Sequence, residues 1–213
     1  MTAGPKAKSE ANRANDTRTR IMEAAEDAFA YYGFSGASLQ DIADRVGVKK
    51  ASLFYYFKGK EELYAEVIQR VFKALEEILF PAIYDRQSGY EEKIAAMVGN
   101  TFDLLAKHPN YPRMLYRELL DNEEDVAEVS TLLFGPLIET ATGFIDKGIR
   151  EEALKPVEPM HFIVSTLASI SFYFVSVPLF EPHWGRELLS EPAINERRGE
   201  VINLTLNSIL MGR

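Results

Sequence analysis

The sequence predicts an all-α fold, in which a short N-terminal group of three helices precedes a longer helical region. Apolar residues recur at helical spacing, and no stretch shows the alternation typical of a half-buried strand. The 213 residues, 46% of them hydrophobic and 26% charged, suit one or two domains with a substantial core. The sequence contains no cysteine, which excludes disulfides and thiolate metal sites.

Charge is distributed unevenly along the chain. The net charge is −8, yet residues 1–60 carry 10 Lys and Arg against 7 Asp and Glu, while the remainder carries 14 against 25. A basic N-terminal region followed by an acidic remainder indicates that the N-terminal region binds a polyanion. Residues 1–15 are polar, without apolar periodicity, and are expected to form a disordered tail. No signal peptide pattern opens the chain, so we expect a cytoplasmic protein.

The first domain, residues 16–60, is expected to begin with an amphipathic helix. Thr17 or Asp16 is a suitable cap for this helix, and its apolar stripe includes Ile21 and Phe29. Gly33 is expected to end it, because glycine readily adopts the left-handed conformation that closes many helices.

Residues 38–57 predict a helix-turn-helix motif. Ser38 is expected to cap the first helix, Gly47 permits a left-handed turn, and the second helix is expected from about Lys50 to Phe57. The exposed face of that helix carries cations and hydroxyl groups, namely Lys49, Lys50, Ser52, Tyr55 and Tyr56. Such a helix can enter the major groove of DNA. Plain packing of two helices around a glycine turn gives the same pattern, so the motif alone leaves both interpretations open.

The second domain, residues 61–213, is predicted to be helical throughout. Helices are expected from residue 61 to near Pro81, around 94–105, over 112–120, from 123 through 145 and from about Asn195. Gly135-Pro136 is expected to kink the fourth of these, because Pro136 cannot donate a backbone hydrogen bond.

Residues 159–180 contain no Asp, Glu, Lys or Arg. This window is long enough to span a bilayer. However, its hydroxyl residues lower its hydrophobicity, and no basic cluster flanks it. Pro178 is expected to end the helix, before a loop over 179–194. We therefore favour a helix buried within a protein assembly, with no membrane partner. The last helix is also apolar on most sides, so the simplest arrangement is a homodimer in which the last two helices pair with their copies.

Residues 17–68 resemble the DNA-binding domain of the tetracycline-repressor (TetR) family. The agreement is gapless over AAEDAFAYYGFSGASLQDIADRVGVKKASLFYYFKGKEEL, from Ala24 to Leu63. The matching features are Tyr32-Gly33-Phe34, the Ser38 cap, Asp41-Ile42-Ala43, Gly47-Val48, Leu53-Phe54-Tyr55-Tyr56-Phe57 and Lys60-Glu61. The rest of the chain resembles the family only in its general character, as an all-helical ligand-binding and dimerisation domain, and not in specific motifs.

The resemblance implies a homodimeric transcriptional regulator, usually a repressor, that binds a double-stranded DNA operator and is released by a small-molecule effector. A transcriptional activator, or an effector-independent regulator of the same fold, is the alternative. Carried over by position, Ser52 and Tyr55 are expected to contact phosphates or base edges, and Lys60 a phosphate at a helix N-terminus. The expected DNA-binding residues are Thr17, Arg18, Ser38, Gln40, Lys49, Lys50, Ser52, Tyr55, Tyr56 and Lys60.

Three positions depart from the family pattern. The family commonly has Ser or Thr at the position of Lys49, Gly at that of Ala51 and Tyr at that of Phe54. Lys49 leaves its helix without a side-chain cap, and Phe54 lacks a hydroxyl contact. These departures bear on the base readout and not on docking in the groove.

An effector pocket is expected between helices of the second domain, for a mostly apolar ligand with one or two polar groups. The candidate wall residues are Met97, Phe102, Leu105, Met114, Tyr116, Phe134, Phe162, Thr166, Ser169, Phe172 and Tyr173. A packed core uses the same residue types at the same spacing. His108, His161 and His183 show no metal-ligand spacing, so no catalytic residue, metal or cofactor is predicted, and an enzyme is not expected.

Overall fold

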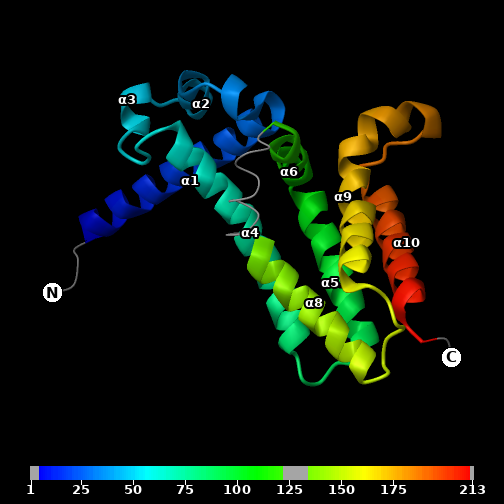
Figure 1. The fold of residues 1–213 in the computed structure, drawn as a ribbon. Helices are drawn as coiled ribbons and strands as arrows, with labels where there is room; N and C mark the ends of the chain where they lie inside the picture. The colour runs from blue at the N-terminus through cyan, green and yellow to red at the C-terminus, as the bar shows by residue number, and fades with distance from the viewer. Residues whose placement is uncertain (1–4, 122–133, 212–213) are drawn as a thin grey trace. The chain divides into compact units, whose positions relative to one another are not determined.

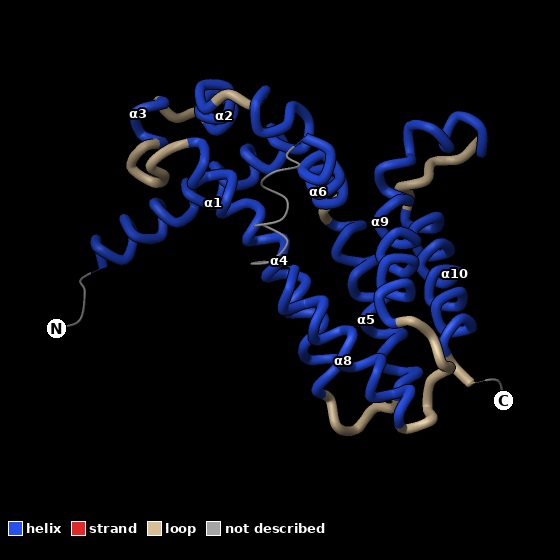
Figure 2. Tube along the Cα trace, in the orientation of Figure 1, coloured by secondary structure: helices blue, strands red, loops and turns tan. Residues whose placement is uncertain are grey.

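A computed structural model describes residues 5–121 and 134–211 (Figure 1). The described part is helical and contains no strand (Figure 2), which confirms the all-α fold. Its one extended pairing is an isolated antiparallel bridge between Leu154 and Leu210. The helices are α1 (Pro5–Gly36), α2 (Leu39–Val46), α3 (Lys50–Leu53), α4 (Lys60–Tyr84), α5 (Tyr90–Lys107), α6 (Asn110–Asp121), α8 (Gly135–Arg150), α9 (Pro159–Trp184) and α10 (Glu191–Ile209).

The chain divides into two compact units, Met1–Arg70 and Val71–Arg213. The sequence places this boundary at the start of α4, whereas the structure places it within that helix. The reason is that the first turns of α4 belong to the N-terminal core. Leu63 is fully buried there, and the Tyr64 ring packs edge-on against Phe29 of α1, with 4.9 Å between the ring centroids. α4 therefore contributes residues to both units.

α1 begins at Pro5, so the structure gives a helix over a segment that the sequence assigns to a disordered tail. This segment lacks the apolar stripe by which helices are recognised, yet it is rich in Ala, Lys, Glu and Arg, which are strong helix formers. Proline also suits the first position of a helix. At its other end α1 breaks at Gly33, whose φ of 72° and ψ of 176° are not helical. The predicted break at this glycine is confirmed.

In the second unit, α5 packs against both α9 and α10. A Cβ added at Gly99 of α5 would lie 2.5 Å from a guanidinium nitrogen of Arg198, so the glycine permits this close approach. The Arg198 guanidinium donates in turn to the Asp103 carboxylate at 2.8 Å. Between α5 and α9, the Phe102 and Phe174 rings pack with their centroids 5.0 Å apart. These contacts fix α5 at the centre of the unit's apolar core.

α8 is described from Gly135, with Pro136 in its first turn. At that position the missing proline N–H leaves no helical hydrogen bond unmade. The kink predicted where this dipeptide joins residues 123–133 lies outside the described residues.

The C-terminal helices differ from the prediction in their limits. α9 continues through Pro178 and Pro182 to Trp184, and α10 begins at Glu191, so the predicted end at Pro178 and the loop over 179–194 are wrong. A proline removes one backbone donor but does not by itself stop a helix. The helix stops at Gly185, where the backbone turns left-handed with a φ of 71°.

Side chains of α9 hold the turn that follows it. The Glu181 carboxylate accepts a hydrogen bond from the Leu188 N–H at 2.8 Å, and the Tyr173 hydroxyl donates to the Leu188 carbonyl at 2.6 Å. Burial raises the pKa of Tyr173, which keeps this hydroxyl protonated as a donor. Two long-range bonds to one residue therefore anchor the connection into α10.

Large apolar side chains on α9 and α10 remain exposed. On α9, Met160, Val164 and Leu167 recur at helical spacing; Phe172, Leu179 and Phe180 are exposed further along the helix, and on α10 Leu204 is 57% exposed. By length and composition α9 is the one described helix that could cross a membrane, but a single helix of this kind is weak evidence for a span. Large exposed apolar patches often mark sites of association.

Glu26 is a buried carboxyl group in the N-terminal unit, only 8% exposed. Burial raises its pKa to about 7, an effect that the positive charge of Arg70 opposes and the carboxylates of Asp27 and Glu23 reinforce. The group is therefore half protonated near neutral pH, and charging it costs folding free energy.

We expect Glu26→Gln to raise the free energy of unfolding at pH 8 and to change it little at pH 5. The pKa of Glu26 is about 7 in the folded protein, against an ordinary value of 4.5 for a glutamate. At any pH between these two pKa values, unfolding therefore releases a proton. The stabilisation is complete below pH 4.5 and is lost as the pH rises through 7. Ionisation of Glu26 should thus lower the free energy of unfolding of the wild type by about 2 kcal/mol between pH 5 and pH 8.

Urea unfolding followed by circular dichroism at both pH values measures the difference. The exposed Asp16 on the same helix, whose charge does not act on Glu26, provides the control Asp16→Asn, which should follow the wild type. A pH dependence shared by the wild type and Glu26→Gln would contradict the assignment.

Candidate nucleic-acid interface and effector pocket

The caps of α2 fix the turn that leads into α3. The Ser38 hydroxyl accepts from the backbone N–H of Gln40 at 3.2 Å, so Ser38 is the N-cap that the sequence predicts. At the other end Gly47 has a left-handed φ of 77°. The N–H of Val48 then bonds to the Ala43 carbonyl at 3.0 Å. These bonds complete the turn of a helix-turn-helix without placing a side chain in a strained conformation.

α3 is shorter than predicted but remains anchored from beneath. Its α-helical part ends at Leu53, whereas the sequence predicts a helix to Phe57. The N–H groups of Tyr56 and Phe57 both bond to the Leu53 carbonyl, at 2.9 and 3.1 Å, so the chain stays tightly wound. Phe57 is buried, as predicted. The buried residues beneath the motif are Ile42, Ala43, Val46, Leu53 and Phe57.

The opposite face of α3 is open to solvent. Lys49, Lys50 and Ser52 are exposed there, and Tyr55 is 82% exposed. Tyr56 is half-buried, with its ring edge-on to that of Tyr55 at 5.2 Å between centroids. Two cations, a serine hydroxyl and two phenols thus gather on one short surface, which we call the α3 face. Lys49 begins α3 without a side-chain cap, as the sequence predicts.

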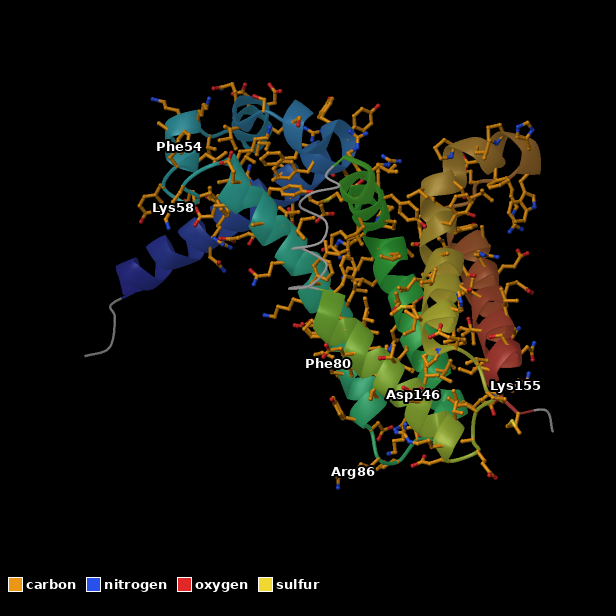
Figure 3. All side chains as sticks on the ribbon, in the orientation of Figure 1. Phe54, Lys58, Phe80, Arg86, Asp146 and Lys155 are labelled. Carbon is orange, nitrogen blue, oxygen red and sulfur yellow. The ribbon has the colours of Figure 1, made fainter. Side chains whose placement is uncertain are left out.

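Two labelled residues mark the edge of this region. Figure 3 labels Phe54, which directly follows α3, and Lys58, which lies on the loop between α3 and α4. Phe54 is 48% exposed, and the Lys58 side chain is almost fully solvated, its one ion pair being with Glu62 at 3.9 Å. The apolar Phe54 ring thus adds a contact surface but no hydrogen bond.

Lys60 is held at the first turn of α4. Its Nζ donates to the Ser35 carbonyl at 3.3 Å and lies 4.7 Å from the centroid of the Phe34 ring. The ammonium group therefore has a defined position beside the free N–H groups of the helix N-terminus, where an anion is favoured.

Three other expected DNA-binding residues already have partners within the protein. The Arg18 guanidinium pairs with the Glu66 carboxylate and lies over the Phe57 ring, 5.0 Å from its centroid. The Gln40 side chain donates to Asp44 at 2.8 Å. Thr17 is half-buried and also makes an interaction. These side chains are less available than those of the α3 face.

The second unit contains an apolar cavity of about 160 Å³, lined by residues of α4, α5, α8 and α9 and by Phe134. The structure brings four of the eleven expected wall residues to this cavity, namely Met97, Phe134, Phe162 and Thr166. The wall residues that the sequence reasoning missed are Leu75, Leu79, Ile94, Val98, Thr101, Leu137, Ile138, Ala141, Phe144, Ile145, Ile163, Leu167 and Ile170.

The structure places the other expected wall residues away from this cavity. Phe102, Leu105, Met114 and Tyr173 are buried away from the cavity. The remaining three face other surroundings: the Tyr116 hydroxyl lies 3.1 Å from the Ser171 hydroxyl, the Ser169 hydroxyl donates to the Ser165 carbonyl, and Phe172 is half exposed. The reason is rotation about the helix axis, because residues of the same type on a different face of one helix meet a different neighbour.

A periodic signal for the missed residues exists in the sequence. Leu75 and Leu79 are one helical turn apart on α4, and the wall residues of α8 recur at spacings of three and four from Phe134 to Ile145. The pattern identifies the inward face of each helix. It does not reveal which inward faces leave a cavity between them.

A helix-turn-helix head and a helical body that contains a cavity together define a DNA-binding transcriptional regulator. Residues 21–67 match the family described as bacterial regulatory proteins, tetR family, and residues 91–204 match the tetracyclin repressor-like C-terminal domain. The chain belongs to the tetR family of bacterial regulatory proteins, which confirms the resemblance seen in the sequence.

Relatives align over most of the chain. The HTH-type transcriptional regulator RutR of Escherichia coli (strain K12) is 27% identical over 196 residues, which are 89% of this chain and 88% of RutR. The ketosteroid transcriptional regulator KstR2 of Mycobacterium tuberculosis superposes with a TM-score of 0.69 at 17% identity, covering 92% of this chain and 95% of KstR2. FadR from Bacillus subtilis, in complex with stearoyl-CoA, superposes with a TM-score of 0.67 at 17% identity, covering 89% and 98%. The two structures share the fold.

We expect Gly47→Ala to destabilise the N-terminal unit by about 1 kcal/mol, because alanine is strained at a left-handed φ. A Cβ at this position would meet no atom within 4 Å, so the effect arises from the backbone alone. Gly47→Asn should cost less, since asparagine tolerates this conformation. Thermal unfolding of the three proteins by circular dichroism should rank them Gly, Asn, Ala. An unchanged melting temperature for Gly47→Ala would refute a strained left-handed turn.

Proposed function

We propose that this regulator represses transcription by binding an inverted-repeat operator through the α3 face, and that a small, largely apolar effector in the cavity releases it. The observation that carries the proposal is the α3 face itself, where Lys49, Lys50, Ser52 and Tyr55 are exposed above a buried apolar side. Tyr55 is 82% exposed there, and neither lysine forms an ion pair with a residue that the structure describes.

The chemistry of the α3 face suits a duplex. Lysines supply the sequence-independent attraction to phosphates, which accounts for much of the affinity and makes it sensitive to salt. The Ser52 and Tyr55 hydroxyls can donate to phosphates or meet base edges. Lys60 and the N-terminus of α4 offer a second phosphate site. Arg18 and Gln40 would contribute only after exchanging Glu66 and Asp44 for DNA.

The exposed apolar surface of α9 and α10 supports a homodimer. A two-fold axis lets one surface meet its own copy, so Val164, Leu167 and Leu204 would become buried in a four-helix seam. Each dimer would then carry two α3 faces, and half-sites about 34–36 Å apart would match them. As a regulator of chromosomal DNA, the dimer would act in the cytoplasm.

α4 offers a route from the cavity to the DNA-binding residues. It supplies Leu75 and Leu79 to the cavity wall and begins with Lys60 in the N-terminal unit. An effector shifts the protein between states only by binding one of them more tightly. Effector binding that displaces the part of α4 at the cavity wall would change the spacing between the two N-terminal units of the dimer. The operator binds only dimers with the matching spacing.

We expect Lys60→Ala to weaken binding to every DNA sequence alike and to reduce the slope of log affinity against log salt concentration by about one, because one phosphate contact is lost. Fluorescence anisotropy with labelled DNA from upstream of the protein's own gene, and with an unrelated duplex, measures both effects. Lys58→Ala is the matched control, because Lys58 is a solvated lysine two residues away and should leave the slope unchanged. A wild-type slope for Lys60→Ala would remove Lys60 from the interface.

We expect Leu204→Glu to convert the dimer to a monomer, because the substitution places charge in the proposed seam. Sedimentation velocity at micromolar concentration measures the mass. Leu120→Glu on α6 is the control, because Leu120 is 78% exposed on a helix outside the seam. A dimer that persists in Leu204→Glu, or a wild-type protein that sediments as a monomer, would overturn the proposed seam.

A further inference from the structure

Among the residues that the structure describes, none at the wall of the cavity in the second unit offers a counter-charge to a ligand. Its 17 lining residues are apolar except for Thr101 and Thr166. An ionised ligand group would lose its hydration there without gaining an ion pair, at a cost of several kcal/mol. The wall therefore selects against carboxylates, phosphates and ammonium groups.

The two threonines differ from others in the described helices. Thr140, Thr142 and Thr205 each donate to the carbonyl four residues earlier, at 2.7 to 2.9 Å. Thr101 of α5 and Thr166 of α9 make no hydrogen bond to any residue that the structure describes. Each hydroxyl thus keeps one donor and its acceptor lone pairs at the cavity wall. A half-buried hydroxyl in apolar surroundings gains from any ligand that supplies a partner.

The volume of about 160 Å³ limits the size of the ligand. An apolar protein cavity of about 150 Å³ accommodates benzene. A stearoyl chain, such as that of the molecule bound in the FadR structure, is far larger than this cavity.

We propose that the effector is a compact, uncharged molecule of about six to ten non-hydrogen atoms, an aromatic or alicyclic alcohol, phenol or ketone. Its apolar body fills the cavity, and its one polar group bonds to Thr101, Thr166 or both. This inference rests on the proposed function, because it assumes that the cavity is the effector site.

Isothermal titration calorimetry of the full chain at pH 7.5 tests the ligand class with matched probes. 4-Methylphenol should bind at least about tenfold more tightly than 4-methylbenzoate, which has a similar ring but a negative charge. Toluene should bind more weakly than 4-methylphenol, and stearoyl-CoA should not compete with it. The proposal is overturned if 4-methylbenzoate binds as tightly as 4-methylphenol, or if neither neutral probe binds up to its solubility limit.

Substitutions in the wall test the two hydroxyls. The double variant Thr101→Val/Thr166→Val keeps the side-chain shapes and should weaken 4-methylphenol about tenfold while leaving toluene unaffected. Thr142→Val is the matched control, because its hydroxyl bonds within α8 and does not line the cavity. Ala141→Leu should abolish binding of both neutral probes by filling the cavity. Unchanged 4-methylphenol affinity in the double variant would overturn the role of the threonines, and the wild-type comparison of charged and neutral probes decides the ligand class even if a variant does not fold.

The same probes separate this inference from the proposed function. If 4-methylphenol binds in the cavity but leaves the anisotropy of the protein–DNA complex unchanged, the assigned ligand class holds and effector release fails. If the protein binds its upstream DNA and only the anionic probe releases it, the proposed function holds and the assigned ligand class is overturned.

Discussion

The inner side of α3 is apolar, and its burial decides which side chains α3 presents to solvent. Leu53 is 0% exposed and Phe57 is 1% exposed, and burying a side chain of this size contributes about 1.5–3 kcal/mol. A single helical turn is not stable in isolation, so these contacts with the rest of the N-terminal unit hold α3 in place. Turning α3 over would bury Lys50 and expose Leu53. The polar α3 face is thus a consequence of core packing, and the proposed docking on DNA relies on the side chains that this packing leaves exposed.

α4 is subject to two constraints at once. Its first turns are part of the N-terminal core through Leu63 and Tyr64, while Leu75 and Leu79 line the cavity. A ligand that fills the cavity must therefore pack against the same helix that places Lys60. Continuity of one helix is the physical basis on which we propose a link between effector occupancy and DNA affinity.

The local signals in the sequence were sufficient for the helix-turn-helix. Ser38 and Gly47 act within two to four residues of themselves, so their capping roles could be predicted without knowledge of the fold, and the structure confirms both. The length of α3 was overestimated because the turn after Leu53 keeps helix-like bonds without being a regular helix. The start of α1 was missed because residues 5–15 have helix-forming composition but no apolar stripe.

Features that depend on distant packing could not be predicted in the same way. The uncharged helix was expected to end at Pro178, yet it ends at Gly185, where the backbone is left-handed. Met97 and Thr166 were placed correctly at the cavity, whereas Phe102 and Tyr173, of equally suitable chemistry, pack into the core. Which of these residues meets the cavity depends on how four helices are rotated against one another.

The central claim is that a pair of α3 faces, presented by a dimer, docks on a duplex. Hydroxyl-radical footprinting of the full chain on its own upstream DNA tests this claim directly. We expect two protected DNA segments that are related by two-fold symmetry and lie about one helical turn apart from centre to centre. Binding should saturate at two chains per site. Protection of one unsymmetrical segment by a single chain, or no sequence-specific protection at all, would contradict it.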